Sequence, residues 1–137
     1  MTNRAHEHRL RVRYAETDQM GVVHHANYLV YVEEGRTRMM AARGCSYAEF
    51  ERNGWGLPVR KAELRYRTVA RYEDELVIRT NVDRVGPASV RFATQIALAT
   101  DGTVVAEALV ELACVRLDDP ARKPVALPSS LRERLAE

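Results

Sequence analysis

The sequence is poor in cysteine and contains no long apolar run. Its two cysteines, Cys45 and Cys114, stand far apart without Cys-x-x-Cys spacing, so we expect neither a disulfide framework nor a structural metal site. Both thiols are predicted to be buried. No stretch approaches the length that spans a bilayer, and the polar N-terminal residues do not resemble a signal peptide. The expected location is therefore the cytoplasm.

The chain also lacks an excess of charge of either sign. Its 21 Lys and Arg side chains nearly balance 19 Asp and Glu side chains, which argues against a nucleic-acid-binding arm or a polybasic membrane patch. Only two of the 21 are lysines; arginine suits phosphate groups where it lines a pocket, but a coding bias explains the excess as well. The length predicts one domain over residues 1–137, with a frayed N-terminus at residues 1–7 and a C-terminal tail at residues 118–137.

What the sequence does contain is periodicity. Residues 9–14 alternate between apolar and arginine side chains, as a half-buried strand does. Residues 15–26 break this alternation and form a loop, and residues 28–43 carry apolar or small side chains at helical spacing. Gly35 in mid-helix costs roughly 1 kcal/mol relative to alanine, which predicts that another element packs closely there. Gly44 supplies the left-handed conformation that ends the helix.

After this helix the pattern changes to short elements. Ser46 followed by Glu49 is a capping box that predicts a short second helix. Alternation typical of strands then recurs in four stretches, residues 61–68, 76–83, 90–98 and 104–117. The last stretch is apolar on both faces, so we expect it to be central or buried at an interface. Ser129 and Ser130 are predicted to cap a final helical turn or two.

The order of elements predicts an α+β fold in which a sheet curls around one apolar helix. Such an arrangement buries the broad apolar stripe of the helix and the inner faces of the strands. The outer face of the sheet would remain partly apolar, which favours oligomerisation.

The loop before the long helix carries a distinctive set of residues: Arg11-Val12, then Thr17-Asp18, then GVVHHANY over residues 21–28. This pattern resembles the signature of the 4-hydroxybenzoyl-CoA thioesterase family of hot-dog-fold proteins, and within it the acyl-CoA thioesterase subgroup associated with the Tol-Pal envelope system. The likeness extends to about Leu117. It implies a five-stranded antiparallel sheet wrapped around one long helix, a homodimer with a shared active site, and a homotetramer. The implied substrate is an acyl-CoA thioester, hydrolysed without a metal or redox cofactor.

Asp18 matches the catalytic carboxylate of that family. Thioester hydrolysis needs an oxygen nucleophile at the carbonyl carbon, either the carboxylate itself or a water molecule that it activates, and the sequence leaves both routes open. The plain alternative for Asp18 is a turn residue. A free backbone N–H at a helix start suits the oxyanion, and by motif position this is the amide of His25, with Val23 or His24 as helpers. The His25 side chain either orients the water or the substrate, or hydrogen-bonds in the turn.

The remaining motif residues are predicted to be structural. His24 is expected to pack, and Tyr14 is expected in the core. We expect Thr17 and Asn27 to hold the loop by hydrogen bonds from side chain to backbone. We expect Tyr28 and Tyr31 in the core. For the phosphates of coenzyme A the candidates are Arg60, Ser89 and Arg91, although charges that alternate along a strand usually form a solvated face.

Two other functions were weighed against the sequence, a second enzyme activity and a non-catalytic binding role. A hot-dog dehydratase needs a His and an acidic residue paired on the helix in that family's arrangement, which HHANYLVYVEE over residues 24–34 lacks. A non-catalytic module would bind acyl-CoA or acyl carrier protein, or contact an envelope complex. Neither nucleic acid nor membrane insertion is expected. The sequence leaves the acyl group open among short, long and aromatic forms.

Overall fold

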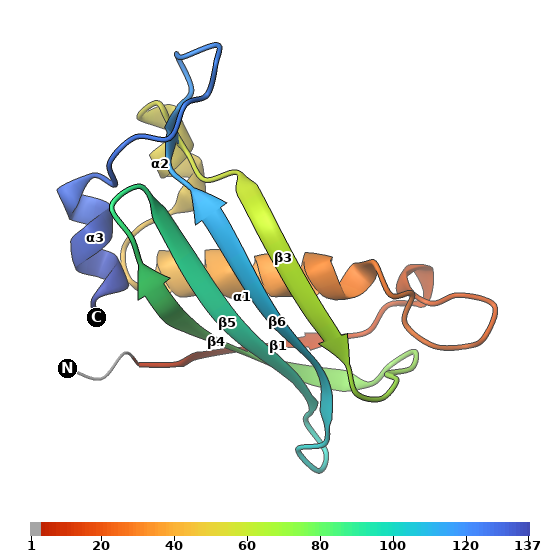
Figure 1. Ribbon diagram of the computed structural model, residues 1–137. Coiled ribbons are helices and arrows are strands. Elements are labelled where there is room, and N and C mark those ends of the chain that lie inside the picture. The colour runs from red at the N-terminus through yellow and green to blue at the C-terminus, as the bar shows by residue number, and fades with distance from the viewer. Residues whose placement is uncertain (1–3) are drawn as a thin grey trace.

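Figure 1 shows a sheet that curls around one long helix. The structure is a computed structural model and describes residues 4–137. Its longer elements are β1 (His6–Arg11), α1 (Asn27–Ala42), α2 (Tyr47–Arg52), β3 (Val59–Tyr66), β4 (Glu75–Val85), β5 (Ser89–Leu98), β6 (Val104–Ala113) and α3 (Ser129–Leu135). A 3-10 turn, η1 (Tyr14–Glu16), follows β1, and two short strands, β2 (Trp55–Gly56) and β7 (Val115–Arg116), pair with each other.

The five long strands form one antiparallel sheet in the order β1-β4-β5-β6-β3. Alternate side chains point toward α1 and are buried, for example Ile78, Phe92 and Val110, whereas their neighbours face away from the helix. The predicted α+β class and the five-stranded sheet are therefore confirmed. β6, whose sequence is apolar on both faces, lies inside the sheet between β5 and β3, as predicted. β1 and β3 are the two edges.

α1 approaches the sheet most closely at Gly35. A Cβ atom at this position would lie 2.6 Å from Cγ2 of Ile78 and 2.8 Å from Oγ1 of Thr80, both on β4. Contacts this short do not occur between real side chains, so the absence of a side chain lets the helix sit deep in the curved sheet. The prediction of a close neighbour at Gly35 is confirmed. At the other end of α1, Gly44 has φ +82°, in agreement with the predicted left-handed cap.

The first strand and the two termini differ from the expectation. β1 begins at His6, inside the segment predicted to be frayed, and it ends at Arg11 because the chain then turns into η1. Residues 1–3 of that segment lie outside the described residues. The C-terminal tail folds back, and α3 buries Leu131 and Leu135. The predicted final helix is confirmed as α3, but its N-cap is Pro128, so the predicted serine cap is wrong.

Smaller features agree with the sequence. Oγ of Ser46 accepts the N–H of Glu49 at 3.5 Å and so caps α2. Cys114 is buried as predicted, whereas Cys45 is half-buried, and burial raises the pKa of both thiols. Within residues 4–137, no helix is both long enough and apolar enough to cross a membrane.

Candidate functional site

Asp18 lies in a tight turn between η1 and α1. Its N–H donates to the carbonyl oxygen of Val22 at 2.9 Å, and its own carbonyl accepts the N–H of Gly21 at 2.9 Å. Oδ1 of the carboxylate accepts the N–H of Met20 at 2.9 Å. One carboxylate oxygen therefore fills the structural role of a turn aspartate. The other, Oδ2, accepts no hydrogen bond from residues 4–137, and the side chain is half-buried.

The backbone that leads into α1 leaves one N–H donor free. Five neighbouring amides donate hydrogen bonds, those of Val23, His24, Ala26, Asn27 and Tyr28. The amide of His25 donates none within the described part of the chain. Val23 and His24 were predicted as helpers, but their N–H groups already donate to the carbonyls of Ala70 and Glu16, at 2.8 and 2.9 Å. The free donor stands two residues before the start of α1, where the helix dipole adds partial positive charge.

Glu16 ties this loop to α1 and was missed by the sequence analysis. Its Oε1 accepts the N–H of Arg13 and the hydroxyl of Tyr31, both at 2.8 Å, and its backbone carbonyl accepts Nδ2 of Asn27 at 2.9 Å. Burial alone would raise the pKa of the Glu16 carboxyl, but the hydrogen bonds from Arg13 and Tyr31 outweigh it and hold the pKa below its usual value. Burial, followed by the bond to Glu16, raises the pKa of Tyr31. The spacing of Arg13 and Glu16 was the available signal.

The structural predictions for four motif residues are confirmed. Oγ1 of Thr17 donates to the carbonyl of Tyr14 at 2.7 Å, and Asn27 holds the carbonyl of Glu16 as described above. Tyr28 and Tyr31 are each 3% exposed and lie in the core. The loop is thus fastened to the helix by polar bonds and anchored beneath by two aromatic rings.

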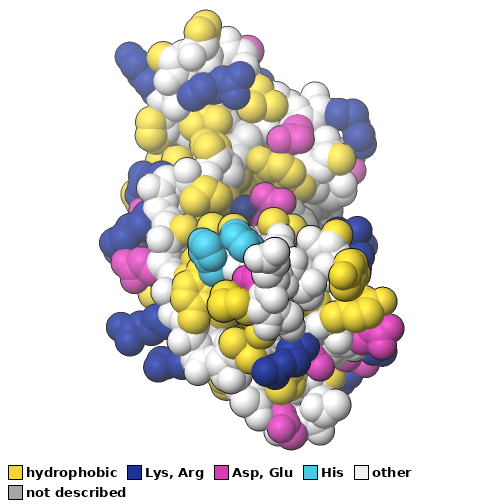
Figure 2. Space-filling model, turned by 90° about the vertical axis from the view of Figure 1, so that its right-hand side faces the viewer, with side chains coloured by type: hydrophobic (Ala, Val, Ile, Leu, Met, Phe, Trp, Pro, Cys, Tyr) yellow, Lys and Arg dark blue, Asp and Glu magenta, His cyan; other side chains and the backbone are white. Residues whose placement is uncertain are grey.

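Two predictions for this segment are wrong. Tyr14 is 76% exposed, because the turn into η1 ends the alternation of β1 before this residue, and its ring packs edge-on against Tyr72 instead. His24 is exposed rather than packed; its Nδ1 accepts the N–H of Ala26 at 3.2 Å, and its ring centroid lies 4.3 Å from that of His25. Figure 2 shows histidine side chains on the surface at this end of the molecule, among hydrophobic side chains.

The edge strand β3 reaches this site at its C-terminal end. The hydroxyl of Tyr66, the last residue of β3, donates to the carbonyl of His25 at 3.2 Å. Tyr66 is half-exposed. The free edge of the sheet and the Asp18 loop are therefore neighbours.

The predicted phosphate-binding residues lie elsewhere in the chain. Nε of Arg60 binds Glu111 at 2.7 Å, and Nε of Arg91, which pairs with Glu111 across the β5–β6 ladder, binds Asp83 at 2.6 Å. Ser89 is at the start of β5. Arg60 precedes Tyr66 by six residues, which is about 20 Å along a strand. Within one chain, the structure gathers Arg60 and Arg91 around Glu111 but does not bring them to Asp18.

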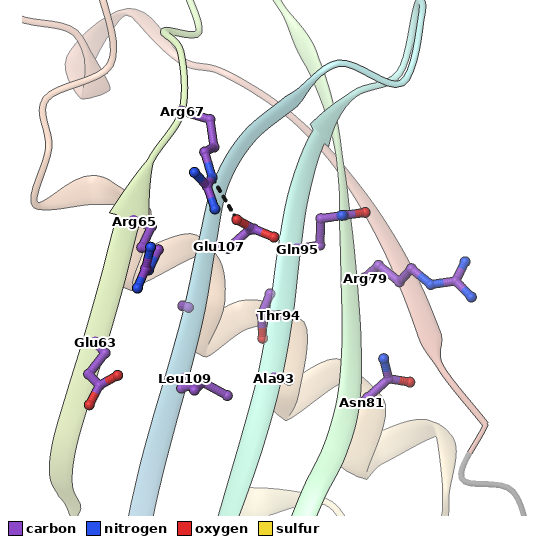
Figure 3. A pocket seen from close by; sticks show the side chains of 11 residues that line it. Glu63, Arg65, Arg67, Arg79, Asn81, Ala93, Thr94, Gln95, Glu107 and Leu109 are labelled. Carbon is purple, nitrogen blue, oxygen red and sulfur yellow. Dashed lines mark hydrogen bonds and ion pairs between the residues drawn. The ribbon is translucent and has the colours of Figure 1, made fainter.

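A hollow of about 450 Å³ lies on the outer face of the sheet, and neither Asp18 nor His25 lines it. Figure 3 shows polar and charged side chains around it, with Arg67 bonded to Glu107. Two of its arginines are paired, Arg67 with Glu107 and Arg79 with Glu7. Among the described residues, no three His, Cys, Asp or Glu side chains are grouped so that they could hold a metal ion.

Comparison with known proteins gives consistent matches. The sequence model of the thioesterase-like superfamily matches residues 12–135. The acyl-CoA thioester hydrolase YbgC of Escherichia coli is 36% identical over 123 residues, which cover 89% of each chain. A match to YneP of Bacillus subtilis is 42% identical over 74 residues and spans 54% of each chain. The crystal structure of DHNA-CoA thioesterase from Staphylococcus aureus has a TM-score of 0.89 at 27% identity, over 95% of this chain and 87% of that one.

Proposed function

We propose that Asp18 is the catalytic carboxylate of this chain, which belongs to the thioesterase-like superfamily and is an acyl-CoA thioester hydrolase with the hot-dog fold. The reaction adds water to the thioester and gives a free acid and the thiol of coenzyme A. One observation carries the proposal: a carboxylate oxygen of Asp18 and the amide of His25 are both without a partner in the described chain, on the same loop.

The two groups have complementary roles. The N–H of His25 donates to the carbonyl oxygen of the thioester, and this bond strengthens as negative charge develops there. Loss of such a donor typically costs about 10²–10³ in kcat. Oδ2 of Asp18 either attacks the carbonyl carbon and expels the thiolate, leaving an anhydride that water then cleaves, or takes a proton from the attacking water. Single turnover in ¹⁸O-water identifies an anhydride that water cleaves at the Asp18 carbonyl, because that step leaves ¹⁸O in the Asp18 carboxyl group and none in the product acid, whereas water activated by Asp18 labels only the product acid.

The first test replaces the charge of Asp18 while keeping its turn. Asp18→Asn retains an oxygen that accepts the N–H of Met20, so we expect an intact fold but a loss of at least about 10²-fold in thiol release. Asp101→Asn is the matched control, because Oδ1 of Asp101 accepts the N–H of Thr103 at the same 2.9 Å in a remote turn. Equal activity of the two variants on every thioester that is cleaved would overturn the assignment of Asp18.

The same thiol-release assay distinguishes hydrolysis from a second candidate function, binding without catalysis. A module that binds acyl-CoA or acyl carrier protein without catalysis would release no thiol from a panel of acyl-CoAs, yet would still bind coenzyme A. The free Oδ2 of Asp18 favours hydrolysis, because a binding module has no need of an unpaired carboxylate beside the acyl group.

The active site is proposed to be completed by a second copy of the chain that pairs along β3. β3 is an open edge, and its two ends carry half-exposed apolar side chains, Val59 and Tyr66. Both stand on the side of the sheet that faces α1, since they pair with the buried Leu112 and Ala106. A twofold axis at the middle of β3 brings the Val59 end of one copy beside the Tyr66 end of the other, and so covers both side chains.

This dimer also gives the predicted phosphate-binding residues a role. Arg60, near the start of β3, would approach the Asp18 loop of the other copy, and Arg91 and Ser89 would lie behind it as contacts for the coenzyme A phosphates. Pairing of dimers into a tetramer through the outer sheet face is part of the same proposal. We also propose that the chain belongs to the Tol-Pal-associated subgroup, and the support for this is the GVVHHANY motif at residues 21–28.

A further inference from the structure

A second pocket, of about 320 Å³, opens between α1, α2 and the start of β3. Its walls are mainly apolar and include Met40, Leu57, Phe92 and Leu112. At about 30 Å³ for each water-sized group, the volume suits roughly ten non-hydrogen atoms. Its size and lining therefore match a short acyl group.

The unusual member of the lining is Arg36. Its side chain is 9% exposed, and its guanidinium makes no hydrogen bond with any described residue. Its one charged partner is the carboxylate of Glu33 at 3.6 Å, which is 65% exposed. The hydroxyl of Tyr47, which also faces the pocket, is engaged by the N–H of Leu57. The guanidinium nitrogens are not among the fully enclosed unpaired atoms, but they lie at a mainly apolar pocket without a hydrogen-bond acceptor from the described residues, so an oxygen of a ligand can supply one.

The pocket meets the Asp18 loop across the proposed dimer. Val59 lines the mouth of the pocket at one end of β3, and Tyr66 holds the carbonyl of His25 at the other end. In a twofold pair these ends are adjacent, so an acyl group on the Asp18 loop of one subunit points toward the pocket of its partner. Glu33, at the exposed rim, can turn to solvent when an anion enters.

We propose that Arg36 determines specificity by binding a carboxylate at the far end of a short acyl group, so that the preferred substrates are dicarboxylic acyl-CoA thioesters. The inference rests on the proposed hydrolase function and deepens it. Charge-assisted bonds from the guanidinium group of an arginine to a carboxylate are strong and specific. The apolar walls contact an aliphatic acyl group of the same length equally well, so the two kinds of substrate differ only at the terminal carbon, where the carboxylate meets Arg36.

The test compares two substrates of equal chain length, adipoyl-CoA and hexanoyl-CoA. We expect the wild-type ratio of kcat/KM, adipoyl over hexanoyl, to be well above one, and Arg36→Met to lower this ratio by at least about tenfold. Arg36→Lys keeps the charge but not the fork and should give an intermediate ratio. Arg38→Met is the matched control, because Arg38 is exposed on the same helix. An unchanged ratio in Arg36→Met, or a wild-type ratio at or below one, would overturn the proposal.

Two further outcomes are kept distinct. If Arg36→Met does not fold, as judged by circular dichroism, Arg36→Lys alone decides through its ratio. If the wild type cleaves no thioester, the proposed function fails, and Arg36 is then tested by calorimetry with non-hydrolysable thioether analogues of the two substrates. Tighter binding of the carboxylated analogue, lost in the Arg36 variant, supports the inference, and equal binding overturns it.

Discussion

Glu16 shows how single residues shape the site without taking part in its chemistry. Its carboxylate accepts hydrogen bonds from Arg13 and Tyr31, and its backbone carbonyl accepts the N–H of His24 and the side-chain Nδ2–H of Asn27. Because these bonds engage the neighbours of His25, they leave the His25 amide as the free donor. The Glu16 side chain is 13% exposed, and its bond from Tyr31 is partly buried, whereas its bonds from Arg13 lie at the surface.

Glu16 predicts a pH-dependent stability. Its folded-state pKa is depressed, so the stability that its charge contributes is complete above the unfolded pKa of about 4.3 and is lost as pH falls through the lower folded value. Glu16→Gln should lower the free energy of unfolding at pH 7 by about 1.5 kcal/mol, the lower end of the range for hydrogen bonds to charged groups, because the bonds from Arg13 are exposed. The difference from wild type should shrink toward zero below about pH 4. Urea unfolding of both proteins between pH 7 and 3 measures this, and a gap that widens on acidification would contradict it.

The sequence predicted the site residues well where the residue type and its motif indicate a role. It predicted them less well where exposure depends on the local path of the backbone. Asp18 and the amide of His25 were singled out from the motif, and within residues 4–137 Oδ2 of Asp18 and the N–H of His25 have no hydrogen-bond partner. Tyr14 was misplaced because the chain leaves the strand after Arg11, and alternation carries no information about where a strand ends. His24 was expected to pack from its position in the motif, but it is exposed on the loop before α1. The pocket around Arg36 could not be predicted, because it is made by three elements that meet only in the folded chain.

At the scale of elements, the depth of α1 in the sheet depends on Gly35. Gly35→Ala gains about 1 kcal/mol of helix propensity, but the new Cβ would lie 2.6 Å from Cγ2 of Ile78. Overpacking of this kind costs about 1–3 kcal/mol, so we expect a net loss of stability in urea unfolding. Arg38→Ala, on the exposed face of the same helix, should change stability by no more than about 0.5 kcal/mol. A more stable Gly35→Ala protein would show that the helix can lift from the sheet at no cost.

The elements themselves were largely predictable, for a physical reason. β4 and β5 have one face on α1, so their sequences alternate, and Gly44 stops α1 as its conformation requires. β6 is apolar on both faces, which indicated its place inside the sheet. β2 and β7 have two residues each, too few to show any period. The final helical turn or two predicted at Ser129 and Ser130 is α3, but its packing was not predictable, because Leu131 and Leu135 are buried and α3 contacts β4, which is distant in sequence.

At the scale of the whole molecule, the site is proposed to be divided between two chains. One supplies Asp18 and the His25 amide, and the other supplies the start of β3 and the Arg36 pocket. Activity should therefore fall on dilution below the dissociation constant of the dimer, since neither half is complete alone.

Mixed dimers test this division directly. When Asp18→Asn and Arg36→Met chains are co-expressed with different tags, a mixed dimer contains one site with both substitutions and one with neither. Random pairing then restores adipoyl-CoA hydrolysis to about a quarter of the wild-type rate, although each parent is poor. Co-expression of Asp18→Asn with the double variant is the control and should restore nothing. If Asp18 and Arg36 acted within one chain, every site in the mixed dimer would lack one of them. Recovery would then be absent, and the acyl group would have to lie along α1 of its own subunit.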